Sequence, residues 1–214
     1  MYIPKYFQEN DWPEIRKVID ENSLATVVSC DGGVPVATHV PLRLVEPAPG
    51  KFKLQGHVAR NNQHWRHFER EQKSLAIFAG SNSYISPRWY ENVNVPTWNY
   101  LAVHVYGKPR LVSDAAELHQ LMKGLVDRYE GHVEASSRYT IESLPADYLE
   151  AQLRSIVGFE ISVDEVHASF KLSQNRNERD HENVMAELRK SHDQDAHGVA
   201  CAMAFQRERE KKNA

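Results

Sequence analysis

Residues 99–112, NYLAVHVYGKPRLV, alternate between apolar and polar side chains over most of their length. In an extended chain, Leu101, Val103 and Val105 point to one side, while His104 and Tyr106 point to the other. This pattern is typical of a long strand in a sheet that has one covered face. We therefore expect a fold built around β-structure.

Shorter β-rich segments flank this strand on both sides. Residues 24–30 form a β-branched run that ends at Asp31-Gly32-Gly33, a hairpin turn signal, and a return strand is expected at about residues 36–44. Further strands are expected at residues 52–58, 75–78 and 156–170.

Helices are predicted between the strands by capping signals and by apolar stripes with helical spacing. Asp11, Pro13 and Glu14 mark one start, and Asp114 with Glu117 marks another. Further helices are expected through residues 65–68, from about 145, and in the polar last forty or so residues. Hairpin-linked strands with inserted helices favour a mainly β, antiparallel barrel with peripheral helices (α+β) over a doubly wound sheet.

Composition describes an ordinary soluble globular chain of 214 residues, with 41% hydrophobic and 26% charged residues. The formal net charge of −3 and the absence of a basic face make direct DNA binding doubtful. The tail at residues 207–212 mixes acids with bases and is expected to be a solvated, frayed helix end. The two cysteines, Cys30 and Cys201, lie far apart and are expected to be buried rather than disulfide-bonded.

The expected cellular location rests on two sequence features that are not found. No apolar run approaches the roughly 20 residues of a membrane helix, and the N-terminus lacks a signal-peptide layout. We therefore expect a cytoplasmic protein without a membrane segment. The P-loop, GxGxxG, GxSxG and HExxH signatures are also missing, which weakens the case for a nucleotide hydrolase, a Rossmann dehydrogenase or a serine hydrolase. No residue stands out as a catalytic acid or base.

A candidate phosphate site lies at His57-Val58-Ala59-Arg60-Asn61, at the expected junction between the end of a strand and the start of a helix. Free backbone N–H groups at such a junction and the Arg60 guanidinium suit a phosphate monoester. The alternative is that Arg60 forms a surface ion pair while His57 packs internally. His64 and His67 lie nearby at helical spacing, but no carboxylate or cysteine at ligand spacing completes a metal site.

Two further segments carry candidate binding residues. Residues 84–100 are rich in aromatics and hydrogen-bonding side chains, which suits a flat heteroaromatic ring or, alternatively, an aromatic mini-core or a dimer interface. The candidates in this segment are Tyr84, Ser86, Trp89, Thr97, Trp98 and Asn99. After the last strand, Lys171, Gln174 and Arg176 are placed to reach a phosphate or a ring carbonyl, unless the segment is only a capped loop.

Six ordered motifs give the chain a resemblance to a known family. They are Ala37-Thr38-His39-Val40-Pro41-Leu42, Gly56-His57-Val58-Ala59-Arg60-Asn61, Tyr84-Ile85-Ser86-Pro87-Arg88-Trp89-Tyr90, Val95-Pro96-Thr97-Trp98-Asn99-Tyr100, Ile156-Val157-Gly158-Phe159-Glu160-Ile161 and Lys171-Leu172-Ser173-Gln174-Asn175-Arg176. Together they resemble the PaiB family of FMN-binding negative transcriptional regulators. The match covers residues 1–188 as one domain and leaves 189–214 as a helical tail.

The resemblance implies an FMN-binding split β-barrel, related to pyridoxamine-phosphate oxidases and flavin reductases, that forms homodimers with FMN at the interface. It implies that Arg60 holds the FMN phosphate and that Lys171, Gln174 and Arg176 reach the partner's flavin. The chain is short between Tyr90 and Val95, where the family often has a longer basic insert.

Three functions remain open at this point. The first is an FMN-binding transcriptional regulator that acts without an obvious DNA-binding motif. The second is a flavin-dependent oxidoreductase, either an FMN reductase or an oxidase of the pyridoxamine-phosphate-oxidase type, because flavin itself can carry the redox chemistry. The third is a dimeric interaction module that has lost its flavin.

Overall fold

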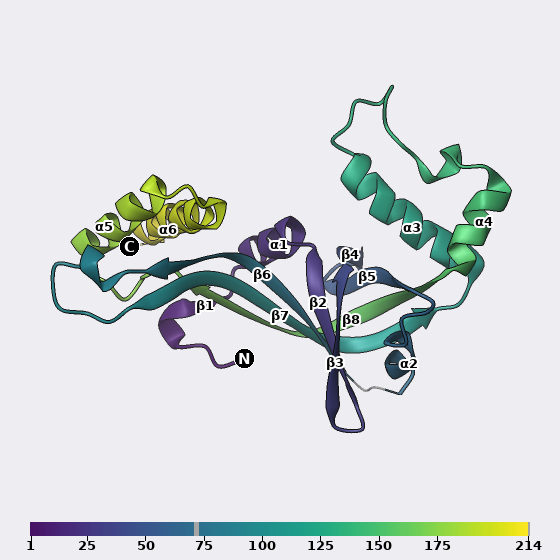
Figure 1. Cartoon of the computed structure of the whole chain (residues 1–214), viewed down its shortest axis with the longest axis horizontal. Coiled ribbons are helices and arrows are strands. Elements are labelled where there is room, and N and C mark those ends of the chain that lie inside the picture. The colour runs from purple at the N-terminus through teal and green to yellow at the C-terminus, as the bar shows by residue number, and fades with distance from the viewer. Residues whose placement is uncertain (71–72, 214) are drawn as a thin grey trace. The chain divides into compact units, whose positions relative to one another are not determined.

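The computed structural model describes residues 1–70 and 73–213 (Figure 1). Its strands are β1 (Gln8–Glu9), β2 (Leu24–Asp31), β3 (Val34–Pro41), β4 (Arg43–Ala48), β5 (Lys51–Ala59), β6 (Ser74–Ile85), β7 (Thr97–Val112) and β8 (Ile156–Lys171). Its helices are α1 (Trp12–Glu21), α2 (Trp65–Phe68), α3 (Ala115–Glu130), α4 (Ala146–Arg154), α5 (Glu178–Lys190) and α6 (Gln194–Asn213). Three 3-10 turns complete it: η1 (Lys5–Phe7), η2 (Pro87–Trp89) and η3 (Ile141–Ser143).

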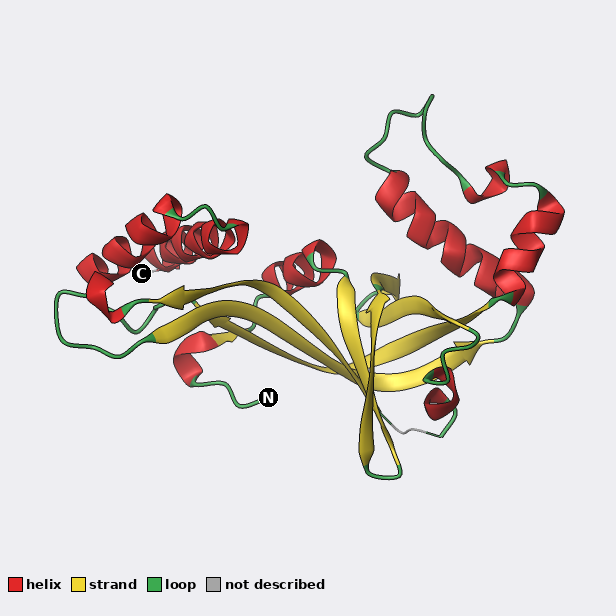
Figure 2. Cartoon of the chain, in the orientation of Figure 1, coloured by secondary structure: helices red, strands yellow, loops and turns green. Residues whose placement is uncertain are grey.

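The strands form one eight-stranded sheet in the order β3-β2-β6-β7-β8-β5-β4, and β1 pairs with β8. The pairs β2–β3, β2–β6, β4–β5, β5–β8 and β1–β8 are antiparallel, as expected for hairpin-linked strands. Helices lie between the strands along the chain and outside the sheet (Figure 2). The mainly β architecture with peripheral helices is therefore confirmed. Within residues 1–70 and 73–213, no helix is long and apolar enough to cross a membrane.

The chain divides into two compact units, which are described separately. The first contains residues 1–22, 78–104 and 167–214, and the second contains residues 23–77 and 105–166. The divisions fall inside β6, β7 and β8, so each of these strands contributes residues to both units.

The second unit has an apolar core between its strands and α3. Leu118, Leu121 and Leu125 on one stripe of α3 pack with Val112, and Leu153 of α4 packs against this cluster. Gly158 of β8 lies so close to α3 that an added Cβ would meet a Leu118 methyl group at 2.6 Å. The predicted cap of α3 is confirmed, because the Asp114 carboxylate accepts the Glu117 N–H at 2.8 Å.

A buried carboxylate network crosses the sheet of the second unit. Glu160 of β8 is 5% exposed and accepts hydrogen bonds from Lys53, Gln55 and Arg110 at 2.7, 2.8 and 2.7 Å. Burial alone raises the pKa of Glu160, but these bonds outweigh it and lower the pKa to about 2. Arg110 also pairs with Glu117 at the start of α3. The network ties three strands to one helix.

The first unit contains two long helices at the C-terminal end of the chain. Helices α5 and α6 lie side by side in Figures 1 and 2 and contact each other. Val184 and Leu188 of α5 and Val199 and Met203 of α6 are almost fully buried. The last forty residues are therefore helical as expected, but they carry a buried apolar face.

Three expectations for this unit were wrong. The Asp11 side chain makes no capping hydrogen bond to α1, and its carboxylate instead lies 3.7 Å from the Arg209 guanidinium. Residues 207–212 are not a frayed end, since α6 continues to Asn213 and Arg209 bonds Glu9 at 3.0 Å. The strand at 75–78 extends from 74 to 85, because small residues such as Gly80 continue it without an apolar signal.

Two further expectations also fail. The return strand divides at Leu42, because Pro41 has no N–H to donate and the Leu42 N–H turns to the Ser23 carbonyl at 2.8 Å. Cys30 and Cys201 are free thiols, but both residues are exposed rather than buried. Cys30 lies beside the β2–β3 turn, where little covers it.

Candidate functional site

In the first unit, β8 ends in a turn that carries two uncompensated cations. The Lys171 ammonium donates to the Thr97 hydroxyl at 2.5 Å and lies 5.8 Å from the centre of the Phe7 ring. Burial, together with the charge of Arg176, lowers the pKa of Lys171. Within the described part of the chain, no carboxylate pairs with Lys171 or Arg176. Two cations without counterions suit an anionic ligand.

Gln174 fixes the shape of this turn. Its side-chain amide donates to the Phe170 carbonyl at 2.5 Å, and its amide oxygen accepts the Leu172 N–H at 2.7 Å. Ser173 adopts a left-handed conformation with φ +63°, which is strained for a residue other than glycine. Because both ends of the Gln174 amide are engaged, this residue positions its neighbours.

Arg176 joins the turn to the loop that follows β6. Its guanidinium donates to the Asn94 side chain at 3.2 Å and lies 4.8 Å over the Tyr90 ring. The same loop is fastened to α5, where Asp180 accepts the Glu91 N–H at 2.9 Å. The loop and the turn therefore form one polar and aromatic surface.

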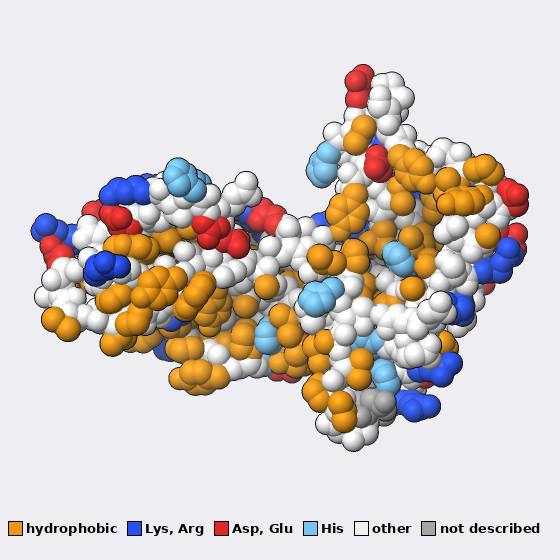
Figure 3. All heavy atoms as spheres, viewed as in Figure 1, with side chains coloured by type: hydrophobic (Ala, Val, Ile, Leu, Met, Phe, Trp, Pro, Cys, Tyr) orange, Lys and Arg blue, Asp and Glu red, His pale blue; other side chains and the backbone are white. Residues whose placement is uncertain are grey.

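Exposed aromatic and aliphatic side chains border this surface. Tyr84 and Trp98 meet edge to face with ring centres 6.1 Å apart, and they are 46% and 53% exposed. Val93 and Val95 in the loop are fully and 66% exposed. Figure 3 shows hydrophobic side chains gathered over this end of β6 and β7. Trp89 is half-buried, and the buried Ser86 hydroxyl caps η2 by accepting the Arg88 N–H at 3.3 Å.

Asn99 lies beneath the turn rather than on its surface. It is fully buried, and its amide donates to the Ser173 hydroxyl at 2.9 Å and to the Met203 sulfur at 3.5 Å. These contacts make Asn99 a support for the strained Ser173.

In the second unit, Arg60 lies just after β5. Its Nε donates to the Arg154 carbonyl at 2.7 Å and its Nη2 donates to the Ile156 carbonyl at 2.8 Å. These acceptors are neutral, so the Arg60 charge is uncompensated and Nη1 remains for a ligand. No carboxylate in the described ranges pairs with Arg60, so the predicted surface ion pair is not formed.

The segment after Arg60 is held by a residue that the sequence analysis left unassigned. The Thr38 hydroxyl bonds the Asn62 amide at 3.2 Å and the His64 ring at 2.8 Å. The Asn62 N–H is taken by the Ala59 carbonyl at 2.8 Å, so it is not available to a phosphate. Asn61 itself is exposed.

His57 points away from this segment, into an apolar hollow of about 240 Å³ lined by Met122, Val126, Leu153 and other side chains. Its Nδ1 is buried without a hydrogen-bond partner, and burial lowers the pKa of its ring. This placement agrees with the alternative that His57 packs internally. Among the residues that the structure describes, no group of His, Cys, Asp and Glu is arranged to hold a metal ion.

The structure thus divides the predicted residues into two groups. Nine lie in the first unit: Tyr84, Ser86, Trp89, Thr97, Trp98, Asn99, Lys171, Gln174 and Arg176. His57, Arg60 and Asn61 lie in the second unit. The sequence did not identify Asn94 and Tyr90 as the partners of Arg176. The one signal for this contact was that polar and aromatic residues occur together in the loop after β6.

Comparisons with known proteins agree with this picture. A family model described as "Putative FMN-binding domain" matches residues 1–165. The Bacillus subtilis "Protease synthase and sporulation protein PAI 2" is 40% identical over 94% of this chain and 95% of its own length. An uncharacterized Saccharomyces cerevisiae protein is 35% identical over 61% of this chain and 90% of its own length.

Solved structures show the same fold at low identity. The flavocytochrome Anf3 of Azotobacter vinelandii has a TM-score of 0.61 at 17% identity, covering 85% of this chain and 78% of that one. The FAD and heme binding protein of Mycobacterium smegmatis has a TM-score of 0.60 at 15% identity, covering 84% and 79%. These neighbours are flavin-binding split-barrel proteins, so the predicted fold class is confirmed.

The fold and the family match define a flavin-binding protein of the split-barrel class. The chain belongs to the PaiB family, and FMN is its cofactor. The residues present fit this group: uncompensated Lys171, Arg176 and Arg60 suit its phosphate and its electron-rich ring edge, and exposed Tyr84 and Trp98 suit its flat ring.

Proposed function

We propose that this chain is a PaiB-type FMN protein that works as a homodimer and regulates transcription without reading DNA itself. The observation that carries the proposal is the pair Lys171 and Arg176, two cations in one ordered turn that have no counterion among residues 1–70 and 73–213. Keeping such charges uncompensated is unfavourable, and an anionic ligand relieves it. FMN carries a phosphate dianion and an oxygen-rich ring edge.

In this proposal, Arg60 binds the phosphate through Nη1 while its other donors fix the guanidinium to the β8 backbone. Lys171 and Arg176 face the ring edge of the flavin that the partner subunit holds, and Tyr84 and Trp98 contact the flat ring. Gln174 and Asn99 position this surface. When bound, FMN supplies hydride or single-electron chemistry.

The homodimer is supported by the exposed apolar side chains of the loop. Val93, Val95 and Trp98 are all more than half exposed, although the loop is fastened to α5 through Asp180. Clustered exposed apolar side chains on an ordered segment mark interaction surfaces. A second copy of the chain would cover them and bring each cationic turn toward the partner's flavin.

The regulatory role is supported by the family and by the Bacillus relative, whose name links it to protease synthesis and sporulation. The formal net charge of −3 supports action through the flavin or a partner protein rather than through DNA contacts. We therefore expect no tight, sequence-selective binding of duplex DNA by the pure protein.

The absorption spectrum of the freshly purified protein, followed by an NAD(P)H oxidation assay on the same sample, tests the proposal. A flavin spectrum without turnover supports it. A flavin spectrum with rapid NAD(P)H oxidation supports the oxidoreductase alternative, and a colourless protein that does not bind added FMN contradicts both.

A further inference from the structure

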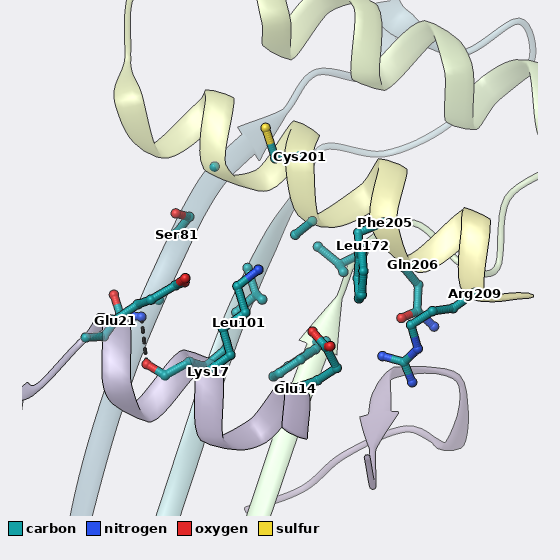
Figure 4. A pocket seen from close by; sticks show the side chains of 16 residues that line it. Glu14, Lys17, Glu21, Ser81, Leu101, Leu172, Cys201, Phe205, Gln206 and Arg209 are labelled. Atoms are coloured by element: carbon teal, nitrogen blue, oxygen red, sulfur yellow. Dashed lines mark hydrogen bonds between the residues drawn. The ribbon is translucent and has the colours of Figure 1, made fainter. Parts of the chain in front are cut away.

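The first unit contains a hollow between α1 and α6, which reaches Phe170 and Leu172, the two residues that flank Lys171. It encloses about 250 Å³, and its floor consists of Leu101, Phe170 and Leu172. In Figure 4, the labelled side chains of α1 and α6 lie on opposite sides of the hollow, with Leu101 and Leu172 between them. The family match ends at residue 165, so α6 lies outside the part of the chain that it accounts for.

The hollow exists because α6 is fastened at both ends. Near its start, Gly198 lies so close to β6 that an added Cβ would come within 2.1 Å of the Ser81 hydroxyl. Near its end, Arg209 bonds the buried Glu9 at 3.0 and 3.3 Å. Between these points, α6 presents the small residue Ala202 toward the hollow. Two fixed ends and a small residue between them keep the space open.

The rim of the hollow has an excess of negative charge. Glu14, Lys17 and Glu21 project from α1, and none of them forms an ion pair with a described residue. Lys17 instead lies 5.6 Å from the centre of the Phe205 ring. Arg209 lies 5.9 Å from the centre of the same ring, pairs with Glu9 and Asp11, and is also stabilised by the charge of Glu14. Around the hollow, the four carboxylates Glu9, Asp11, Glu14 and Glu21 therefore face the two cations Lys17 and Arg209.

We propose that this hollow binds a small organic cation with an apolar body. The apolar floor takes the body, and Glu14 and Glu21 attract the charged head. The volume is just below the roughly 300–1,000 Å³ typical of sites for drug-sized ligands, so the ligand is small.

Calorimetry on the full-length, FMN-loaded protein tests this site with two near-isosteric probes, phenethylamine and hydrocinnamate. We expect phenethylamine to bind once per chain and hydrocinnamate to bind at least several-fold more weakly. Hydrocinnamate binding as tight as phenethylamine, or no phenethylamine binding at all, overturns the proposal.

Variants locate the binding. Glu14→Gln and Glu21→Gln should each weaken phenethylamine roughly two- to fivefold, as expected for exposed charge pairs. Asp20→Asn is the matched control, because Asp20 lies on the same helix, pairs with Arg16 and does not line the hollow. Unchanged affinity in both glutamate variants contradicts the assignment.

Two more substitutions act in opposite directions. Ala202→Phe should fill the hollow and abolish binding, with circular dichroism confirming that the variant is folded. Lys17→Gln removes the only uncommitted cation of the rim and should strengthen binding two- to fivefold, which keeps the proposal testable if Ala202→Phe does not fold. Weaker binding by Lys17→Gln counts against it.

Discussion

Replacing Arg60 with alanine should separate phosphate binding from flavin binding. The Arg60 guanidinium uses Nε and Nη2 to hold the Arg154 and Ile156 carbonyls at 2.7 and 2.8 Å, which leaves Nη1 and the full positive charge for the phosphate. Riboflavin has the same ring but no phosphate. The variant should therefore lose affinity for FMN and keep its affinity for riboflavin.

The expected size of the loss follows from these contacts. One charge-assisted hydrogen bond to the phosphate contributes about 1.5–3 kcal/mol, which corresponds to roughly a ten- to 150-fold increase in the Kd for FMN. The two carbonyl contacts are lost in the same variant, so its free energy of unfolding should fall by about 1–3 kcal/mol. With FMN present, the free energy of unfolding should fall further, because the weaker FMN affinity of the variant adds to this loss.

Fluorescence titration of the apoprotein with FMN and with riboflavin measures both affinities. Arg154→Ala is the matched control, because its exposed side chain pairs with Glu150 and only its backbone contacts Arg60. That variant should bind both ligands like the parent protein. Equal losses of FMN and riboflavin affinity in Arg60→Ala would show that Arg60 only supports the fold.

Two further predictions concern stability and assembly. Breaking a buried ion pair costs about 3–5 kcal/mol, but Lys53 and Arg110 are partly exposed. Glu160→Gln should therefore lower the free energy of unfolding by about 2–3 kcal/mol and the Tm by about 5–10 °C. Glu150→Gln is the control, because Glu150 lies in an exposed ion pair, and it should change the Tm little. The lowered pKa of Glu160 means that its contribution is complete above about pH 4.5 and is lost as the pH falls toward 2, so acid unfolding of Glu160→Gln should show a weaker pH dependence over this range. Val95→Asp should shift the protein from dimer to monomer in light scattering at micromolar concentration, and an unchanged dimer mass would move the interface elsewhere.

The strands were predictable where side chains alternate or where turn residues are distinctive. The alternation at residues 99–112 gave β7, and Asp31-Gly32-Gly33 gave the β2–β3 hairpin. Local patterns failed where distant residues compete for the same group. At the start of α1, the Asp11 carboxylate pairs with Arg209, near the other end of the chain, and makes no capping hydrogen bond to the helix.

For the candidate site, the sequence indicates candidate segments but not the hydrogen bonds that each side chain makes in the fold. Lys171 and Arg176 have no carboxylate partner among the described residues, whereas both ends of the Gln174 amide bond its own turn and Asn99 is buried beneath that turn. Such roles depend on which hydrogen bonds each side chain makes in the fold. Spacing along the chain does not contain that information.

Mixing two variants tests most directly whether each flavin site draws on both subunits. Arg60→Ala and Arg176→Ala homodimers should each bind FMN poorly. If a site combines Arg60 of one chain with Arg176 of the other, a mixed dimer has one doubly damaged site and one intact site. After confirmed subunit exchange, tight FMN binding should therefore return to about half of the sites in the mixed dimers. No recovery of tight binding would mean that both residues serve the same chain's flavin, which contradicts the shared site.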